Sequence, residues 1–335
     1  MSADQLAGLS DDLVLATVLL YLASMIGFAL ELAFGRARTN TGATSITLTE
    51  DGVTEDAPAV AAKATVAVGT AGGGGVAEAA GGGAVVVSPP EPPSWAPKAG
   101  MVAIVLGWLG WATNLGSLVT RGLAVDRWPW GNMYEFVVAI CFAAVTAFLV
   151  TQLRSNVRFL GAFVMVTSAL GLGFAVIWLH VQAGPVVPAL DSYWIAIHVS
   201  AAVIASGLFI VAGVSGILYL IRKDGFSRLP TRDDLERVAH QAIVLSFPIW
   251  TFAVIAGALW ADKAWGRYWG WDPKEVWAFI TWIAYAAYLH ARATAGWRGR
   301  AITIVQLVAF ACLLFNLVGV NIFLGGLHSY ADVGN

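Results

Sequence analysis

Long apolar stretches separated by short polar segments dominate this chain. Eight stretches have the length of about 20 nearly uncharged residues that an α-helix needs to cross the roughly 30 Å hydrocarbon core of a bilayer. A composition of 58% hydrophobic and only 12% charged residues also lies far from that of soluble globular proteins. The pattern therefore predicts an all-α polytopic integral membrane protein with about eight transmembrane helices, near residues 13–35, 100–120, 133–152, 158–179, 194–221, 241–260, 274–292 and 301–325.

The distribution of Lys and Arg predicts how these helices are oriented. Positively charged residues stay preferentially in cytoplasmic loops. With the N-terminus outside, fourteen of the nineteen basic residues fall on the inner side and five on the outer side. Both termini are therefore expected outside, and the outer basic residues are Arg121, Arg127, Lys263, Arg267 and Lys274.

The chain divides into three parts by composition. Residues 1–39 hold the first transmembrane helix, and Asp11 and Asp12 before it argue against a cleaved signal sequence. Residues 40–99 are rich in Ala, Gly and Pro, which predicts a disordered cytoplasmic linker. Residues 100–335 form the main membrane domain. Within it, the charged segment 222–240 predicts a short surface helix capped by Thr231 and Asp234.

The outer loop at residues 260–277 is the most unusual segment. It holds five of the fifteen tryptophans, together with Tyr268. An aromatic belt that anchors helix ends at the membrane surface is one interpretation. The density of rings, interleaved with glycine and cations, favours a second one, in which a large planar ligand packs on the rings and places carboxylates against basic side chains. The candidate contacts are Trp265, Tyr268, Trp269, Trp271, Arg267 and Lys274, with Arg121 and Arg127 as further cations.

Two helix starts on the outer side carry acidic residues. Asp272, Pro273 and Glu275 match an N-cap, a first-turn proline and an acidic third position, so Asp272 is predicted to begin the seventh span. Capping and ligand contact are compatible roles for Asp272. Tyr134 and Glu135 begin the third span. The negative charge of Glu135 either stabilises the N-terminus of this helix or helps to position the ligand pocket.

Four segments together resemble a known family. Trp265-Gly-Arg-Tyr268-Trp269-Gly-Trp271-Asp272-Pro-Lys274-Glu-Val-Trp277 is similar to the tryptophan-rich WWD signature of haem-handling proteins. The segments at 132–136, 192–199 and 326–331 resemble the ResC or CcsA proteins of cytochrome c maturation system II. The similarity runs from about residue 100 to 331. System I haem-handling proteins share the signature but differ at the other segments.

The resemblance implies roles for three of the five histidines. His198, near the outer end of the fifth span, and His328, after the eighth, are expected to ligate the iron of an outer haem through neutral imidazoles. His290 lies near the inner leaflet and is expected to help ligate a second haem inside the membrane. No partner histidine is expected at its depth, so the second ligand is assigned to another subunit. His240 is expected at the cytoplasmic interface.

The family further implies a function and a set of partners. Haem b is expected to enter near His290 and to be presented on the outer face for covalent attachment to the Cys-x-x-Cys-His segment of apocytochrome c. The chain would be a subunit of a cytochrome c haem lyase (synthase) in the plasma membrane of a bacterium, with a ResB-type partner and a thiol reductant protein. A haem exporter without an attachment role and a membrane scaffold remain alternatives. Cys141 and Cys312 lie in no Cys-x-x-Cys-His motif, so the chain is not itself a c-type cytochrome.

Overall fold

The chain folds into a bundle of long helices. The computed structural model describes residues 1–35, 93–186, 188–190, 192–222 and 229–328. These residues contain helices and loops and no strand. The elements are α1 (Ala3–Phe34), α2 (Ala96–Val125), α3 (Met133–Arg154), α4 (Arg158–Phe174), the π-helical turn η1 (Ala175–Leu179), the 3-10 turn η2 (Pro188–Leu190), α5 (Tyr193–Ile221), α6 (Arg232–Trp265), α7 (Pro273–Thr294), α8 (Gly299–Leu314), the π-helical turn η3 (Phe315–Gly319) and α9 (Val320–Phe323).

The predicted fold class is confirmed. Seven helical segments of the described chain have the length and the apolar composition that crossing a bilayer requires. The remaining predicted span, α7, is a helix of 22 residues that is less apolar than the other seven, because it carries Lys274 and Glu275 in its first turn and His290 and Arg292 near its end. In a bilayer, helices satisfy all backbone hydrogen-bonding groups internally, which explains why the apolar stretches fold this way. The chain is an all-α polytopic membrane protein.

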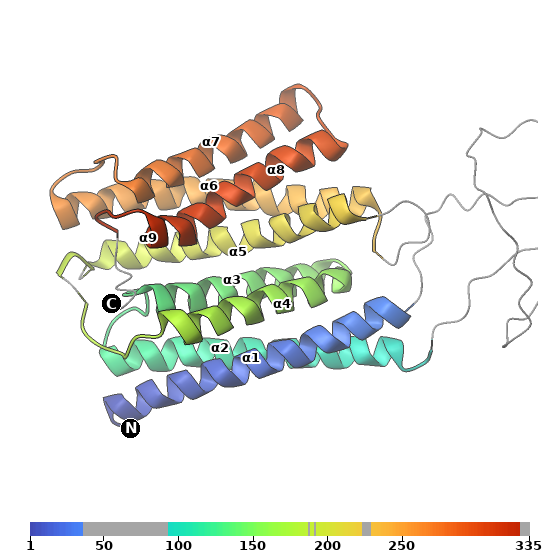
Figure 1. Cartoon of the computed structure of the whole chain (residues 1–335), viewed down its shortest axis with the longest axis horizontal. Coiled ribbons are helices and arrows are strands. Elements are labelled where there is room, and N and C mark those ends of the chain that lie inside the picture. Colours follow the sequence, from blue (N-terminus) through green and yellow to red (C-terminus); the bar gives the residue numbers. More distant parts are fainter. Residues whose placement is uncertain (36–92, 187, 191, 223–228, 329–335) are drawn as a thin grey trace, which may run out of the picture.

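The helices form two groups that lie side by side, α1 to α4 and α5 to α9 (Figure 1). In the first group α1 packs against α2 and α4; in the second, α5 packs against α6, and α7 packs against α8. The contact of α3 with α5 joins the groups. Gly207 makes this contact close, because a Cβ atom there would lie 2.6 Å from the carbonyl carbon of Ala143.

Successive long helices alternate in direction, so the loops gather at two ends of the bundle (Figure 1). The end at which α1 begins, called the N-terminal end below, holds the loops after α2, α4 and α6 and the segment after α9. Most basic residues of the described chain flank the opposite end, where α3, α5 and α7 finish. The positive-inside rule makes the N-terminal end the outer one. The predicted linker, residues 40–99, lies outside the described residues up to residue 92, and α2 begins at Ala96.

The charged segment before the sixth span is helical. The short helix predicted within residues 222–240 is the first part of α6, which runs without a break from Arg232 into the membrane segment. Thr231 caps it as expected, since its side-chain oxygen accepts a hydrogen bond from the Asp234 N–H at 3.1 Å. Charged residues on the first two turns are compatible with one continuous helix, since those turns lie beyond the apolar stretch.

Candidate functional site

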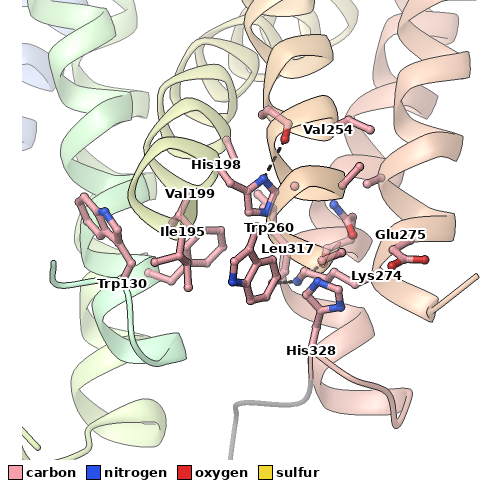
Figure 2. A pocket seen from close by; sticks show the side chains of 18 of the residues that line it. Trp130, Ile195, His198, Val199, Val254, Trp260, Lys274, Glu275, Leu317 and His328 are labelled. Atoms are coloured by element: carbon pink, nitrogen blue, oxygen red, sulfur yellow. Dashed lines mark hydrogen bonds between the residues drawn. The ribbon is translucent and has the colours of Figure 1, made fainter. Parts of the chain in front are cut away.

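A pocket lies near the N-terminal end, between the two groups of helices. Its walls come from the start of α3, from α5, α6 and α7, and from η3 with the segment after α9. Most of these walls are apolar or aromatic, and two of the five histidines face it (Figure 2). Among the lining residues are Trp130, Phe136, Ile195, His198, Trp250, Gly257, Trp260, Tyr268, Trp269, Lys274, Asn316, Asn321 and His328.

His198 enters the pocket from the second turn of α5. Ser192 begins that helix, and its hydroxyl accepts a hydrogen bond from the Trp194 N–H at 3.3 Å. The Nδ1 atom of His198 lies 2.8 Å from the carbonyl oxygen of Ala253 on α6. A carbonyl only accepts, so Nδ1 carries the proton and the lone pair of the neutral imidazole lies on Nε2. The ring orientation of His198 is therefore set by the backbone of α6.

His328 follows α9 and is held by the residue that starts α7. Its Nδ1 atom lies 2.8 Å from Oδ2 of Asp272, and the Leu327 N–H donates to Oδ1 of the same carboxylate at 2.6 Å. Asp272 is also the N-cap of α7, with the capping box that the sequence predicts. One carboxylate thus joins the start of α7 to the segment that carries His328, and a proton on Nδ1 again leaves the lone pair on Nε2.

The ionised form of Asp272 is favoured in the folded protein. Burial alone would raise its pKa, but the hydrogen bonds from His328 and from the N–H groups of Leu327 and Lys274 act in the opposite direction and lower it overall. A carboxyl whose pKa falls on folding stabilises the fold above its unfolded pKa of about 4, and the effect is lost as the pH falls through the folded value. The tie between α7 and His328 is therefore complete at neutral pH.

Tryptophan rings surround both imidazoles. Trp260 is buried and stacks on His198, with ring centroids 5.9 Å apart and planes inclined by 12°. The same Trp260 ring lies 5.6 Å from the His328 ring, and Trp265 lies 4.9 Å from it. Figure 2 shows Trp260 next to both histidines. The two imidazoles therefore share one aromatic environment, although 130 residues separate them in sequence.

The remaining members of the predicted loop divide between the pocket and the surface. Tyr268 and Trp269 line the pocket, whereas Trp271 and Arg267 are exposed. Trp271 has a positive φ of 58°, which turns the chain just before the Asp272 cap. The structure thus brings together only part of the aromatic loop.

Tyr134 and Glu135 belong to a separate network next to the pocket. The Glu135 carboxylate is buried and accepts hydrogen bonds from Arg121 at 3.1 Å, from Arg127 at 2.9 and 3.1 Å, and from the Gly131 N–H at 2.8 Å. Tyr134 donates to Asp11 at 3.3 Å. Arg121 and Arg127, considered from the sequence as carboxylate contacts for a ligand, are therefore paired with a carboxylate of the chain itself.

His290 lies far from the pocket, four residues before the end of α7, and is exposed. The expectation that no other histidine lies at this depth is wrong, because the Nδ1 atom of His240 on α6 is 3.5 Å from the hydroxyl of Tyr288. Residues two apart on a helix point about 200° away from each other. His290 therefore faces away from His240, and the two imidazoles do not share a site.

Two residues of the pocket, Gly257 and Asn316, have no local signal in the sequence. Gly257 allows close approach, because a Cβ atom there would lie 2.7 Å from Cε1 of His198. Asn316 belongs to the π-helical turn η3 and is buried. Lys274, predicted as a ligand contact, also donates to the Asn316 carbonyl oxygen at 2.6 Å. Only an alignment of related sequences could have singled out Gly257 and Asn316, because neither lies in a recognisable pattern.

The chain is similar to proteins of cytochrome c assembly. The sequence model of the family described as "Cytochrome C assembly protein" matches residues 130–328, from the Trp130 wall of the pocket to His328. A protein of Chlamydomonas reinhardtii named cytochrome c biogenesis protein CcsA is 36% identical over 224 residues, which cover 64% of this chain and 64% of that protein. CcsA of Synechococcus elongatus is 32% identical over 290 residues, covering 70% of this chain and 87% of the relative.

A third relative, CcsA of a Synechocystis species, is 31% identical over 305 residues, covering 71% of this chain and 90% of its own length. The family match spans more than half of the chain and includes the pocket and both of its histidines. The protein belongs to the cytochrome c assembly protein family.

Proposed function

We propose that this protein, which acts in cytochrome c biogenesis, holds haem in the pocket and presents it for attachment to apocytochrome c. The observation that carries the proposal is the pair of Nδ1 hydrogen bonds, from His198 to the Ala253 carbonyl and from His328 to Asp272. Imidazoles that bind a metal commonly donate their other ring N–H to a carbonyl or carboxylate. Both histidines thus have the tautomer that an axial iron ligand needs.

The chemistry of the walls fits a tetrapyrrole. Flat aromatic rings give apolar contact to both faces of a planar ring, and the two Nε2 lone pairs supply two neutral ligands for iron. The pocket volume of about 150 Å³ is smaller than the roughly 300–1,000 Å³ of typical ligand pockets. We propose that its wall shifts when haem binds, and that the exposed Tyr268 side chain on the α6–α7 loop takes part in this movement.

Attachment needs little chemistry from the chain itself. Each cysteine thiol of a Cys-x-x-Cys-His segment adds S–H across one haem vinyl group, which forms a thioether without any change in oxidation state. The protein would hold the ring and orient the vinyl groups, so that proximity supplies most of the acceleration. The thiols must be reduced for this addition, and for that reason a thiol reductant protein is included in the proposal.

A membrane partner is proposed to lie against α7. The side chains of Phe279, Ile283 and His290 are exposed at intervals of four and seven residues, which places them on one face of that helix. An exposed imidazole in a transmembrane segment is costly unless another group pairs with it. A ResB-type subunit that supplies a second ligand to a haem at His290, in a bacterial plasma membrane, would meet this need.

Covalent attachment distinguishes the proposal from haem export alone. The protein and its ResB-type partner would be expressed in bacteria that lack their own maturation system, together with a soluble reporter apocytochrome. We expect haem in the purified complex and haem that stays on the reporter after denaturation. A complex with haem and a reporter with none would support an exporter. A folded complex without any haem absorbance would leave the scaffold alternative.

Gly257 offers a sharper test of the pocket. In Gly257→Ala the added methyl group has no room beside His198, so the imidazole must move. Changes to the residues around a metal ligand commonly lower metal affinity by about 10–100-fold, and we expect haem to dissociate about tenfold faster from this variant. The higher helix propensity of alanine, by about 1 kcal/mol, should offset part of the cost of this crowding, so the variant should still fold. Gly173→Ala on α4 is the matched control, because no atom lies within 4 Å of a Cβ there. Equal dissociation rates in both variants would contradict the role of Gly257.

A further inference from the structure

The pocket contains a cation that has no carboxylate partner among the described residues. The Lys274 ammonium donates to the carbonyl oxygen of Asn316 at 2.6 Å and to that of Leu317 at 3.5 Å. An ammonium has three N–H donors, so one remains for another acceptor. The described part of the chain provides no ion pair to Lys274 within 4.0 Å. A positive charge in an apolar pocket is costly unless a negative charge pairs with it.

The acidic residue Asp272, which lies close to Lys274 along the chain, already accepts hydrogen bonds from other groups. Its two oxygens accept hydrogen bonds from His328, from the Leu327 N–H and from the Lys274 backbone N–H. The Asp272 carboxylate therefore stabilises the start of α7 and orients the His328 ring. The Lys274 ammonium instead donates to carbonyl oxygens of the π-helical turn η3 and forms no ion pair with Asp272 within 4.0 Å.

A second polar group on the same wall is also incomplete. Asn316 is only 3% exposed and lines the pocket, yet its Oδ1 atom has no hydrogen-bond partner among the described residues. Buried side-chain amides are nearly always paired in folded proteins. The unpaired Oδ1 atom only accepts, so an ionised carboxylate would bind to the N–H groups of the same amide, and Oδ1 could accept from a protonated carboxyl group. Asn316 belongs to the π-helical turn η3, and π-helical turns frequently occur at functional sites.

We propose that Lys274 and Asn316 form the subsite that binds a carboxylate of the tetrapyrrole. This inference rests on the proposed function, because both residues line the pocket that contains His198 and His328, and Figure 2 shows Lys274 near Trp260 and His328. A carboxylate held at one edge of the ring fixes its rotation about the iron. The subsite would therefore decide which edge carries the vinyl groups toward the apocytochrome.

The test compares haem with its dimethyl ester, in which both carboxylates are blocked. Purified complex, stripped of haem and kept in detergent without anionic lipid, would be titrated with each compound. Hydrogen bonds to charged groups contribute about 1.5–3 kcal/mol, so we expect the wild type to prefer haem by about tenfold to a hundredfold. Iron mesoporphyrin, which keeps the carboxylates but has ethyl in place of vinyl groups, should bind as haem does.

Variants assign the preference to this subsite. Lys274→Met should bind haem and the ester within about threefold of each other, and Asn316→Asp should weaken haem more than the ester by like-charge repulsion. Lys263→Met is the control, since Lys263 is exposed at the same end of the bundle and pairs with Asp262. It should keep the wild-type preference.

The outcomes separate this inference from the proposed function. Haem binding that depends on His198 and His328 but does not distinguish haem from its ester overturns the carboxylate subsite and leaves the haem site intact. A preference for haem over its ester that disappears when phosphatidylglycerol is added would show that a lipid headgroup occupies Lys274. That result would also overturn the carboxylate subsite. The wild-type comparison needs no variant, so a Lys274→Met protein that fails to fold does not remove the test.

Discussion

Replacing either His198 or His328 by alanine is expected to remove haem from the outer pocket. Under the proposed function each imidazole would supply one ligand to the iron, and loss of even the outer hydrogen-bond partner of a ligand lowers metal affinity by about 10–100-fold. Loss of the ligand itself should therefore cost at least a hundredfold in haem affinity. Purified variants should lack the sharp ferrous bands of bis-imidazole haem, and the yield of reporter cytochrome c should fall in parallel.

His180→Ala is the matched control for these variants. His180 lies at the same end of the bundle, but its imidazole pairs with Asp11 at 3.1 Å and does not line the pocket. Imidazole added to the medium should partly restore haem in His198→Gly, because the small ligand can occupy the space of the missing ring. Unchanged haem content in both alanine variants, with the protein folded, would show that these histidines do not bind the iron.

Asp272→Ala is expected to have the second-largest effect, because two functions depend on one carboxylate. Its loss removes the N-cap of α7, which costs about 1 kcal/mol, and also the hydrogen bond that orients His328, which costs about 10–100-fold in metal affinity. We expect faster haem loss in stopped-flow transfer to an acceptor protein and a lower midpoint of thermal unfolding by circular dichroism.

Asp272→Ser separates the two functions. Serine is a good N-cap, so the unfolding midpoint should stay near that of the wild type. Its side chain is too short to reach His328 in the same position, so haem should still dissociate about 10–100-fold faster. If Asp272→Ser retained haem as the wild type does, Asp272 would act only as a helix cap.

Local patterns in the sequence predicted most of the fold. Apolar runs predicted a helix at all eight positions, and seven of these helices are long and apolar enough to cross a bilayer, where each backbone group must be paired within its own helix. The caps at Thr231 and Asp272 were also predictable, since a cap depends on residues within one turn. His198 and His328 could be selected as candidates from family resemblance, and their role as iron ligands stays a prediction.

The tertiary structure decided which of these residues meet. Contacts between residues far apart in sequence depend on helix packing and have no short-range signal. Packing places Gly257 beside His198 and Lys274 against the carbonyl of Asn316, and it commits Arg121 and Arg127 to Glu135. The sequence could therefore determine where helices begin and which residue types are available, while the pairing of each charge was settled only when the helices came together.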